Sequence, residues 1–115
     1  MNFEEIAILC EDKKLSSLDV DAACQVEKIS RLEFFDRLAH WLANAFLEGR
    51  RDFTFCDSAA NNMMYLAEWN LAEFAWSVFL AFDNGEFYRS EDSEEIDPSE
   101  KYTKPMMRRA LSNRV

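Results

Sequence analysis

The chain has 115 residues, the size of one ordinary domain, and carries a formal net charge of −9. Apolar residues make up 49% of it and ten residues are Phe, so we expect a folded core despite the charge, which excludes the intrinsically disordered class. Excess negative charge repels phosphate groups, so nucleic acid and anionic membrane are excluded as expected partners. Basic proteins and cations are the plausible partners.

Glycine and proline are scarce, with two of each in the chain. Sheets joined by tight turns need more of both, because turns use glycine for positive φ and proline for a fixed φ. No internal repeat or proline-rich linker divides the sequence. We therefore predict an all-α fold, in which residues 1–115 form a single-domain bundle of about five or six helices.

The compartment is predicted from the N-terminus and the cysteines. Acids stand among the first residues where a signal peptide needs a basic start, and no stretch approaches the roughly 20 apolar residues of a membrane span. Cys10, Cys24 and Cys56 are odd in number and widely spaced, which predicts neither a disulfide framework nor a metal site. These features indicate buried thiols in a reducing, cytoplasmic setting.

In chain order, the first thirty residues predict a pair of helices. Phe3, Ile6, Ala7 and Cys10 follow helical spacing, and a weaker stripe consists of Leu18, Ala22, Val26 and Ile29. Further apolar stripes predict a long core helix over 31–48, a helix ending near residue 69 that starts at Asp52 or Thr54, a strongly apolar helix over 71–82, and a last helical segment from residue 97.

Helix ends have their own sequence signals. A capping side chain stands three residues before a carboxylate at four places, which predicts four helix starts: Asn2 with Glu5, Ser30 with Glu33, Asn70 with Glu73, and Asp97 with Glu100. Gly49 and Gly85 follow apolar segments and are predicted to be left-handed caps. Pro105 lacks an N–H, so it should divide the last segment into two short helices, with Thr103 as the new cap.

Charge is least evenly distributed near the C-terminus. Residues 83–100 hold eight acids and the single base Arg89, whereas residues 101–115 hold five bases and no acid. One interpretation is structural: the acidic loop is solvated, and the basic side chains stabilise the last helix by interacting with its C-terminal carbonyl groups. The other is a partner-binding surface, in which aromatic side chains supply affinity and acids supply steering: Asp83, Glu86, Phe87, Tyr88, Glu91, Asp92, Glu94 and Glu95.

A family resemblance covers about the last third of the chain. Residues 78–81 (VFLA) followed by acids, 95–97 (EID), and 108–111 (RRAL) resemble the second half of colicin-D-type immunity proteins. The resemblance implies a small acidic helical bundle that occupies the basic active site of a toxin nuclease, with acids in place of nucleic-acid phosphates. It implies contact residues among Asp83, Glu86, Asp92, Glu94 and Glu95.

Two other function classes remain open at the level of sequence. Trp76 and Leu80, on the back of the 71–82 helix, would form the interface of a homo-oligomeric structural or regulatory module. Alternatively, Asn61 and Asn62 would line a pocket for a small molecule between helices. The three Trp residues are interpreted as core residues rather than a ligand cage.

Catalysis is not predicted. His40 is the only histidine, and we interpret it as a partly buried side chain hydrogen-bonded to Asp36 one helical turn earlier. The 83–85 segment lacks the ligand spacing of a calcium loop, and the chain has no phosphate-binding glycine loop, HExxH or GxSxG motif. We therefore predict no enzyme activity, no cofactor, no metal site, and a basic protein or a second copy of the chain as the partner.

Overall fold

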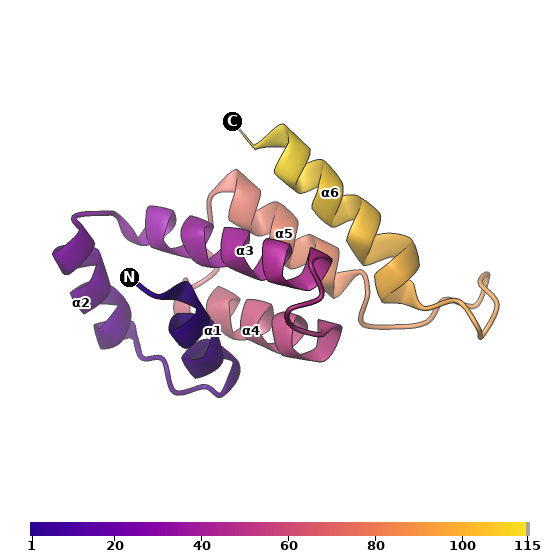
Figure 1. Cartoon of the computed structure of the whole chain (residues 1–115), viewed down its shortest axis with the longest axis horizontal. Coiled ribbons are helices and arrows are strands. Elements are labelled where there is room, and N and C mark those ends of the chain that lie inside the picture. Colours follow the sequence, from indigo (N-terminus) through magenta and orange to yellow (C-terminus); the bar gives the residue numbers. More distant parts are fainter. Residues whose placement is uncertain (115) are drawn as a thin grey trace.

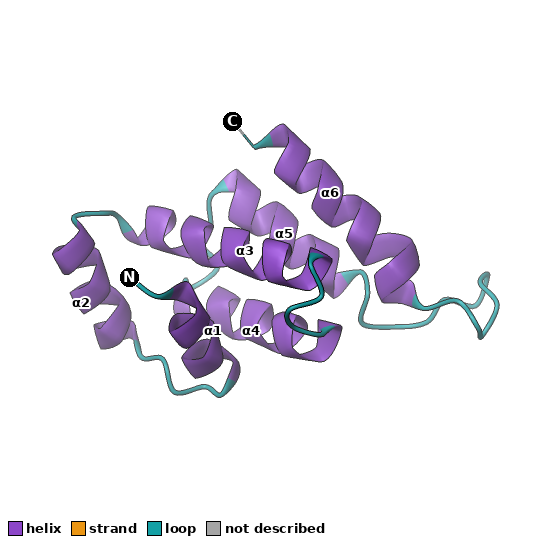
Figure 2. Cartoon of the chain, in the orientation of Figure 1, coloured by secondary structure: helices purple, strands orange, loops and turns teal. Residues whose placement is uncertain are grey.

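A computed structural model describes residues 1–114, which form six α-helices and one π-helical turn and contain no strand (Figures 1 and 2). The elements are α1 (Phe3–Glu11), α2 (Ser17–Glu27), α3 (Arg31–Leu47), α4 (Phe53–Leu66), α5 (Glu73–Asp83), η1 (Ser99–Thr103) and α6 (Lys104–Asn113). The predicted all-α bundle is confirmed. None of these helices is long and apolar enough to cross a membrane.

The helix starts depend on local capping. Asn2, Ser30 and Asp52 each accept a hydrogen bond from the backbone N–H three residues later, at 3.2, 3.1 and 2.9 Å. The predicted starts at residues 2 and 30 are confirmed, and α4 begins after Asp52 rather than Thr54. A reciprocal capping box, formed by Ser16 and Asp19, starts α2 and was not among the predicted starts.

The predicted cap at Asn70 is wrong. The N-cap of α5 is Ala72, which has no side chain able to accept a hydrogen bond. Instead, Asp36 of α3 accepts a hydrogen bond from the backbone N–H of Ala75, with N and Oδ1 3.1 Å apart. A neighbouring helix thus satisfies one of the orphan donors in the first turn of α5.

The predicted helix start at Asp97 is confirmed, because the chain is helical over residues 98–113, whereas the predicted cap at Thr103 is not. The Asp97 carboxylate accepts hydrogen bonds from the backbone N–H and hydroxyl of Ser99, at 2.9 and 2.8 Å, and a π-helical turn follows. That turn runs directly into α6, and Pro105, which has no N–H to donate to the preceding turn, lies just after the junction. Thr103 has helical backbone angles and makes no capping bond, so the predicted cap there is wrong.

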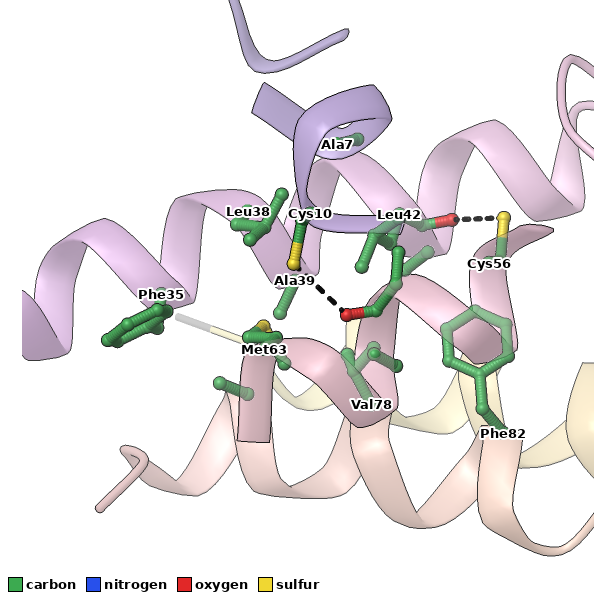
Figure 3. Close-up of a cluster of buried hydrophobic side chains, with 14 of the residues drawn as sticks. Ala7, Cys10, Phe35, Leu38, Ala39, Leu42, Cys56, Met63, Val78 and Phe82 are labelled. Atoms are coloured by element: carbon green, nitrogen blue, oxygen red, sulfur yellow. Dashed lines mark hydrogen bonds between the residues drawn. The ribbon is translucent and has the colours of Figure 1, made fainter. Parts of the chain in front are cut away.

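The core surrounds α3, which contacts every other α-helix. Phe35, Leu38 and Leu42 of α3 are buried against Cys10 of α1 and Met63 of α4, as Figure 3 shows. The small residues of α3 and α4 let these helices approach closely, and all are fully buried: Ala39, Ala43, Ala59 and Ala60. Burial of this side-chain cluster holds the bundle together.

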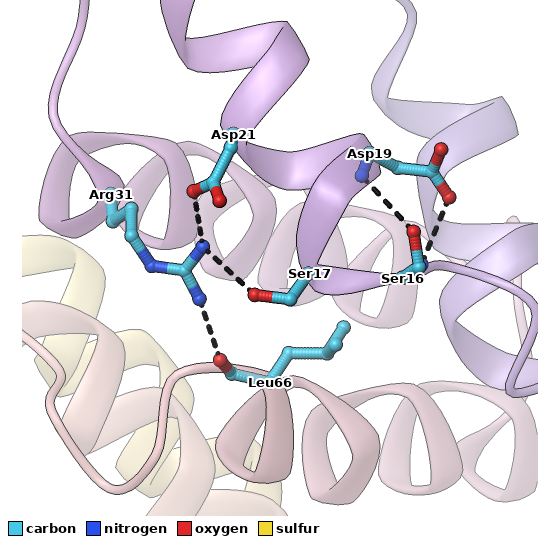
Figure 4. Close-up of polar contacts among 6 residues, drawn as sticks. All are labelled: Ser16, Ser17, Asp19, Asp21, Arg31 and Leu66. Atoms are coloured by element: carbon cyan, nitrogen blue, oxygen red, sulfur yellow. Dashed lines mark hydrogen bonds and ion pairs between the residues drawn. The ribbon is translucent and has the colours of Figure 1, made fainter.

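The apolar stripe predicted for the second helix does not face the core. Leu18 and Val26 are 79% and 78% exposed, while Val20 is the buried residue of α2. Polar contacts fix this helix instead: the Arg31 guanidinium donates to Asp21 Oδ1 at 2.7 Å and to the Leu66 carbonyl at 2.7 Å (Figure 4). Arg31 thereby ties α2 to the end of α4.

Candidate functional site

The acidic segment lies between α5 and α6, where it extends as a loop beyond the ends of the helices (Figure 1). Phe87 and Tyr88 are 54% and 68% exposed on this loop. Glu91, Glu94 and Glu95 are exposed beside them. Two aromatic side chains and three carboxylates are therefore open to solvent on one protruding segment.

Arg89, the one base of residues 83–100, is turned inward. Its guanidinium lies over the rings of Phe87 and Tyr102, 4.9 and 3.6 Å from their centroids. It also donates to the backbone carbonyl of Asn84 at 3.0 Å. These contacts hold the guanidinium at the base of the loop. The charged side chains on the outer surface of the loop are therefore acidic.

Asp92 also faces the body of the protein. Its side chain is 8% exposed and accepts hydrogen bonds from the Lys101 ammonium and the Tyr102 hydroxyl. The bond from Lys101, followed by that from Tyr102, lowers the pKa of Asp92. Asp92 was predicted to contact a partner, but its position gives it a structural role in joining the loop to η1.

A second acidic group lies where the start of α4 meets the end of α5. The Asn61 amide donates to Glu86 Oε2 at 2.9 Å, while Asp57 Oδ1 is shielded from solvent without a hydrogen-bond partner among the described residues. Burial raises the pKa of Asp57 to about 8, and a side-chain hydrogen bond with the Glu86 carboxyl and the nearby charges of Glu86 and Asp83 act in the same direction. Asp83 and Glu86 thus lie near Asp57 and form a group separate from the exposed acids Glu91, Glu94 and Glu95.

An exposed aromatic row continues from this acidic group along α5. The Phe79 ring lies 6.0 Å from Trp76 and 6.3 Å from Trp69, between centroids. Trp69 is 61% exposed, so its interpretation as a core residue is wrong. Trp76 and Leu80 are each 36% exposed, on the outward side of α5 where the sequence placed them.

The two asparagines predicted to line one pocket are separated. Asn62 borders an open hollow of about 390 Å³ and donates to the carbonyls of Cys10 and Glu11, at 2.9 and 3.2 Å, at the C-terminal end of α1. Asn61 does not border this hollow, and its amide donates instead to Glu86. This hollow therefore does not bring the two asparagines together, and a small-molecule pocket lined by both stays a prediction.

His40 has a different neighbour from the one predicted. Its Nε2 lies 3.1 Å from the Asn44 amide nitrogen, and Asp36 is occupied by the N-terminus of α5. His40 is exposed rather than partly buried as predicted; the desolvation that its neighbours still impose, aided by the positive charge of Arg114, lowers its pKa. The ring borders an open hollow of about 620 Å³ on α3, together with Trp41 and Arg50.

The thiols lack the features of reactive cysteines. Cys10 and Cys56 are fully buried, and burial raises the pKa of each to about 12. The Cys10 Sγ lies 3.4 Å from the carbonyl oxygen of Ala59. The Cys56 Sγ lies 3.9 Å from the carbonyl oxygen of Leu42, as Figure 3 shows. A thiol with so high a pKa is a poor nucleophile at neutral pH.

Comparisons with protein families, curated proteins and solved structures find no match to this chain.

Proposed function

We propose that this chain is a cytoplasmic binding protein that neutralises a basic protein partner through the outer loop, as an immunity protein does with its toxin. The outer loop comprises residues 87–95. The observation that carries the proposal is that its only base, Arg89, is stacked inward, while Glu91, Glu94 and Glu95 are exposed beside two aromatic rings.

Each part of this surface has a physical role in binding. Exposed acids attract a basic surface from a distance and raise the association rate. Phe87 and Tyr88 offer large apolar areas of the kind that supply most of the affinity in protein interfaces. The contacts that Arg89 and Asp92 make with Tyr102 fix the base of the loop, so less conformational entropy is lost on binding.

The test is affinity capture from source-cell lysate, comparing the wild type with the loop variant Glu91→Lys, Glu94→Lys, Glu95→Lys. Asp92 stays unchanged because it has a structural role. A basic protein identified by mass spectrometry should be captured by the wild type, weakly at raised salt, and not by the loop variant. Charge attraction between exposed groups is screened beyond about 8 Å at physiological ionic strength.

A matched control variant separates local from global charge. Asp12→Lys, Glu27→Lys, Glu48→Lys changes the net charge by the same amount at positions outside the loop. It should retain capture. The same protein retained by the loop variant, or lost equally by both variants, would contradict the assignment of the outer loop as the binding surface.

A further inference from the structure

One face of the molecule combines aromatic and acidic side chains on neighbouring helices. We name it the α4/α5 face and define it by its aromatic end (Trp69, Trp76, Phe79) and its acidic end (Asp57, Asp83, Glu86). Phe79 and Asp83 stand four residues apart on α5, so they share one side of that helix. Trp76 stands three residues before Phe79 on the same side of α5, so this side of the helix carries residues of both ends. The Phe79 ring contacts Trp69 at the aromatic end, and Asp83 lies near Asp57 at the acidic end.

The chain itself supplies no cation from these helices. Residues 52–88, which contain all of α4 and α5, hold six acids and no Lys, Arg or His. Asp57 Oδ1 is shielded from water without a hydrogen-bond partner among residues 1–114. The carboxyl groups at the acidic end therefore lie close to one another with no positive charge from α4 or α5 to offset them, an arrangement that an incoming cation would stabilise.

We propose that the α4/α5 face binds an amphipathic, basic helix of a protein partner, with apolar residues on the aromatic end and a lysine or arginine at the acidic end. The inference rests on the proposed function in that the partner is a basic protein. It identifies a second binding surface, separate from the outer loop, and it specifies the kind of partner segment that would bind there.

A second copy of the chain fits this face poorly. In a two-fold symmetric pair the same patch meets itself, so each α4/α5 face would bring further acids and no base. Like charges across an interface oppose association. A basic segment instead offsets the carboxylates, and the exposed Trp and Phe rings can contact its alkyl side chains and its cations.

The acidic end also predicts how binding depends on pH. Asp57 is faced by Asp83 from α5 and by Glu86 from the residues after it, while Asn61 on its own helix is neutral. Because burial and these neighbours raise its pKa to about 8, Asp57 is largely protonated in the free protein at neutral pH. A cation that pairs with it releases that proton, so affinity should rise with pH up to about 8, by at most about tenfold per unit.

The experiment uses a synthetic helical peptide of Leu and Lys in amphipathic order, and the same peptide with Glu in place of Lys as its control. Binding to the full chain is followed by tryptophan fluorescence, which should shift to the blue as Trp69 and Trp76 leave water. The Lys peptide should bind, more tightly at pH 8 than at pH 6, and the Glu peptide should not. Equal binding of both peptides would overturn the proposal.

Variants of the protein locate the contact. Trp69→Asn, chosen because Asn tolerates the positive φ of this position, and Asp57→Asn should each weaken binding about tenfold, and Asp57→Asn should also remove the pH dependence. Leu18→Ser, at an even more exposed apolar residue of α2, should bind like the wild type. Binding that is unchanged in the first two variants, or lost in Leu18→Ser, would overturn the proposal.

The outer-loop variant distinguishes this inference from the proposed function. If the loop variant still binds the peptide while the wild type captures no basic protein, the α4/α5 face stands and the proposed function fails. If the loop variant loses the peptide while Trp69→Asn and Asp57→Asn keep it, the α4/α5 face fails. A dimeric mass that becomes monomeric in Trp76→Glu would also overturn the proposal, because a second copy would then occupy the face.

Discussion

Gly85 packs so closely against Thr103 that no side chain fits between them. A Cβ atom on Gly85 would overlap the Thr103 hydroxyl and stand 2.8 Å from Cε2 of Phe53. Gly85 was predicted to be a left-handed helix cap, but its φ is not positive. Its small size brings the end of α5 against η1, and this contact positions the first residues of the acidic segment.

The two glycines should therefore respond differently to alanine. Gly85→Ala forces the Thr103 and Phe53 side chains to move and should lower the free energy of unfolding by about 1–3 kcal/mol. Gly49 has φ +73°, and a methyl group added to it would meet no atom within 4 Å. Gly49→Ala therefore has only backbone strain to bear and should cost about 1 kcal/mol. Urea unfolding of both variants measures the difference, and an equal or larger loss at Gly49 would contradict the packing role of Gly85.

Asp36 should act as a cap for a helix other than its own. Asp36→Ala leaves the Ala75 N–H without its partner and should destabilise the protein by about 1 kcal/mol, with faster hydrogen exchange in the first turn of α5. Asn70→Ala is the matched control, since Asn70 makes no capping bond to α5, and it should leave stability nearly unchanged. A larger loss in the Asn70 variant would restore the cap predicted from sequence.

These two cases show what the sequence could predict about the fold. Caps at Asn2 and Ser30 follow from residues close in the chain, so they were predictable. The Asp36 cap joins residues 39 positions apart, so local sequence could not predict it. The capping pattern of Asn70 with Glu73 instead predicted a cap that the structure lacks. The role of Gly85 depends on Thr103 and Phe53, which meet only in the folded chain.

The candidate site was predictable to a similar extent. Composition alone located the acidic loop, and its exposed aromatic residues lie where the pattern placed them. The inward positions of Arg89 and Asp92 depend on Tyr102, which the sequence could not place beside them. Asp57 and Asn61 are four residues apart on one helix, a signal of a shared face, but only the fold brings Glu86 to them.

Stability should fall with pH as Asp57 ionises. Its pKa in the folded chain, about 8, exceeds its ordinary value of 3.8, so the native state binds more protons than the unfolded state between these values. The stability that Asp57 contributes is complete below about pH 4 and is lost as pH rises through about 8. Asp57→Asn should remove this loss, so its Tm relative to wild type should increase from pH 5 to pH 9. Thermal unfolding at both pH values measures this, and parallel pH profiles would contradict it.

Lys28 should be a site where glycine stabilises the protein. It ends α2 in the left-handed conformation, with φ 56° and ψ 46°, and its N–H donates to the Cys24 carbonyl. Glycine adopts this conformation without the steric cost of a Cβ, so Lys28→Gly should raise the free energy of unfolding by up to about 1 kcal/mol. Lys14→Gly, at an exposed lysine outside the helices with no left-handed backbone, should give no such gain. Chemical denaturation of both variants decides the point, and a gain at Lys14 alone would refute it.

Arg31 should control the attachment of α2. Its guanidinium joins Asp21 of α2 to the carbonyl of Leu66, and Val20 is the one fully buried residue that α2 contributes. Arg31→Met keeps an unbranched side chain but removes the guanidinium and both bonds, so hydrogen exchange should accelerate throughout α2 while α3 and α4 stay protected. Arg37→Met removes an exposed ion pair with Glu33 on the same helix. It should change neither the hydrogen exchange of α2 nor the protection of α3 and α4. Uniform acceleration across all helices in the Arg31 variant would mean that α2 unfolds only with the whole bundle.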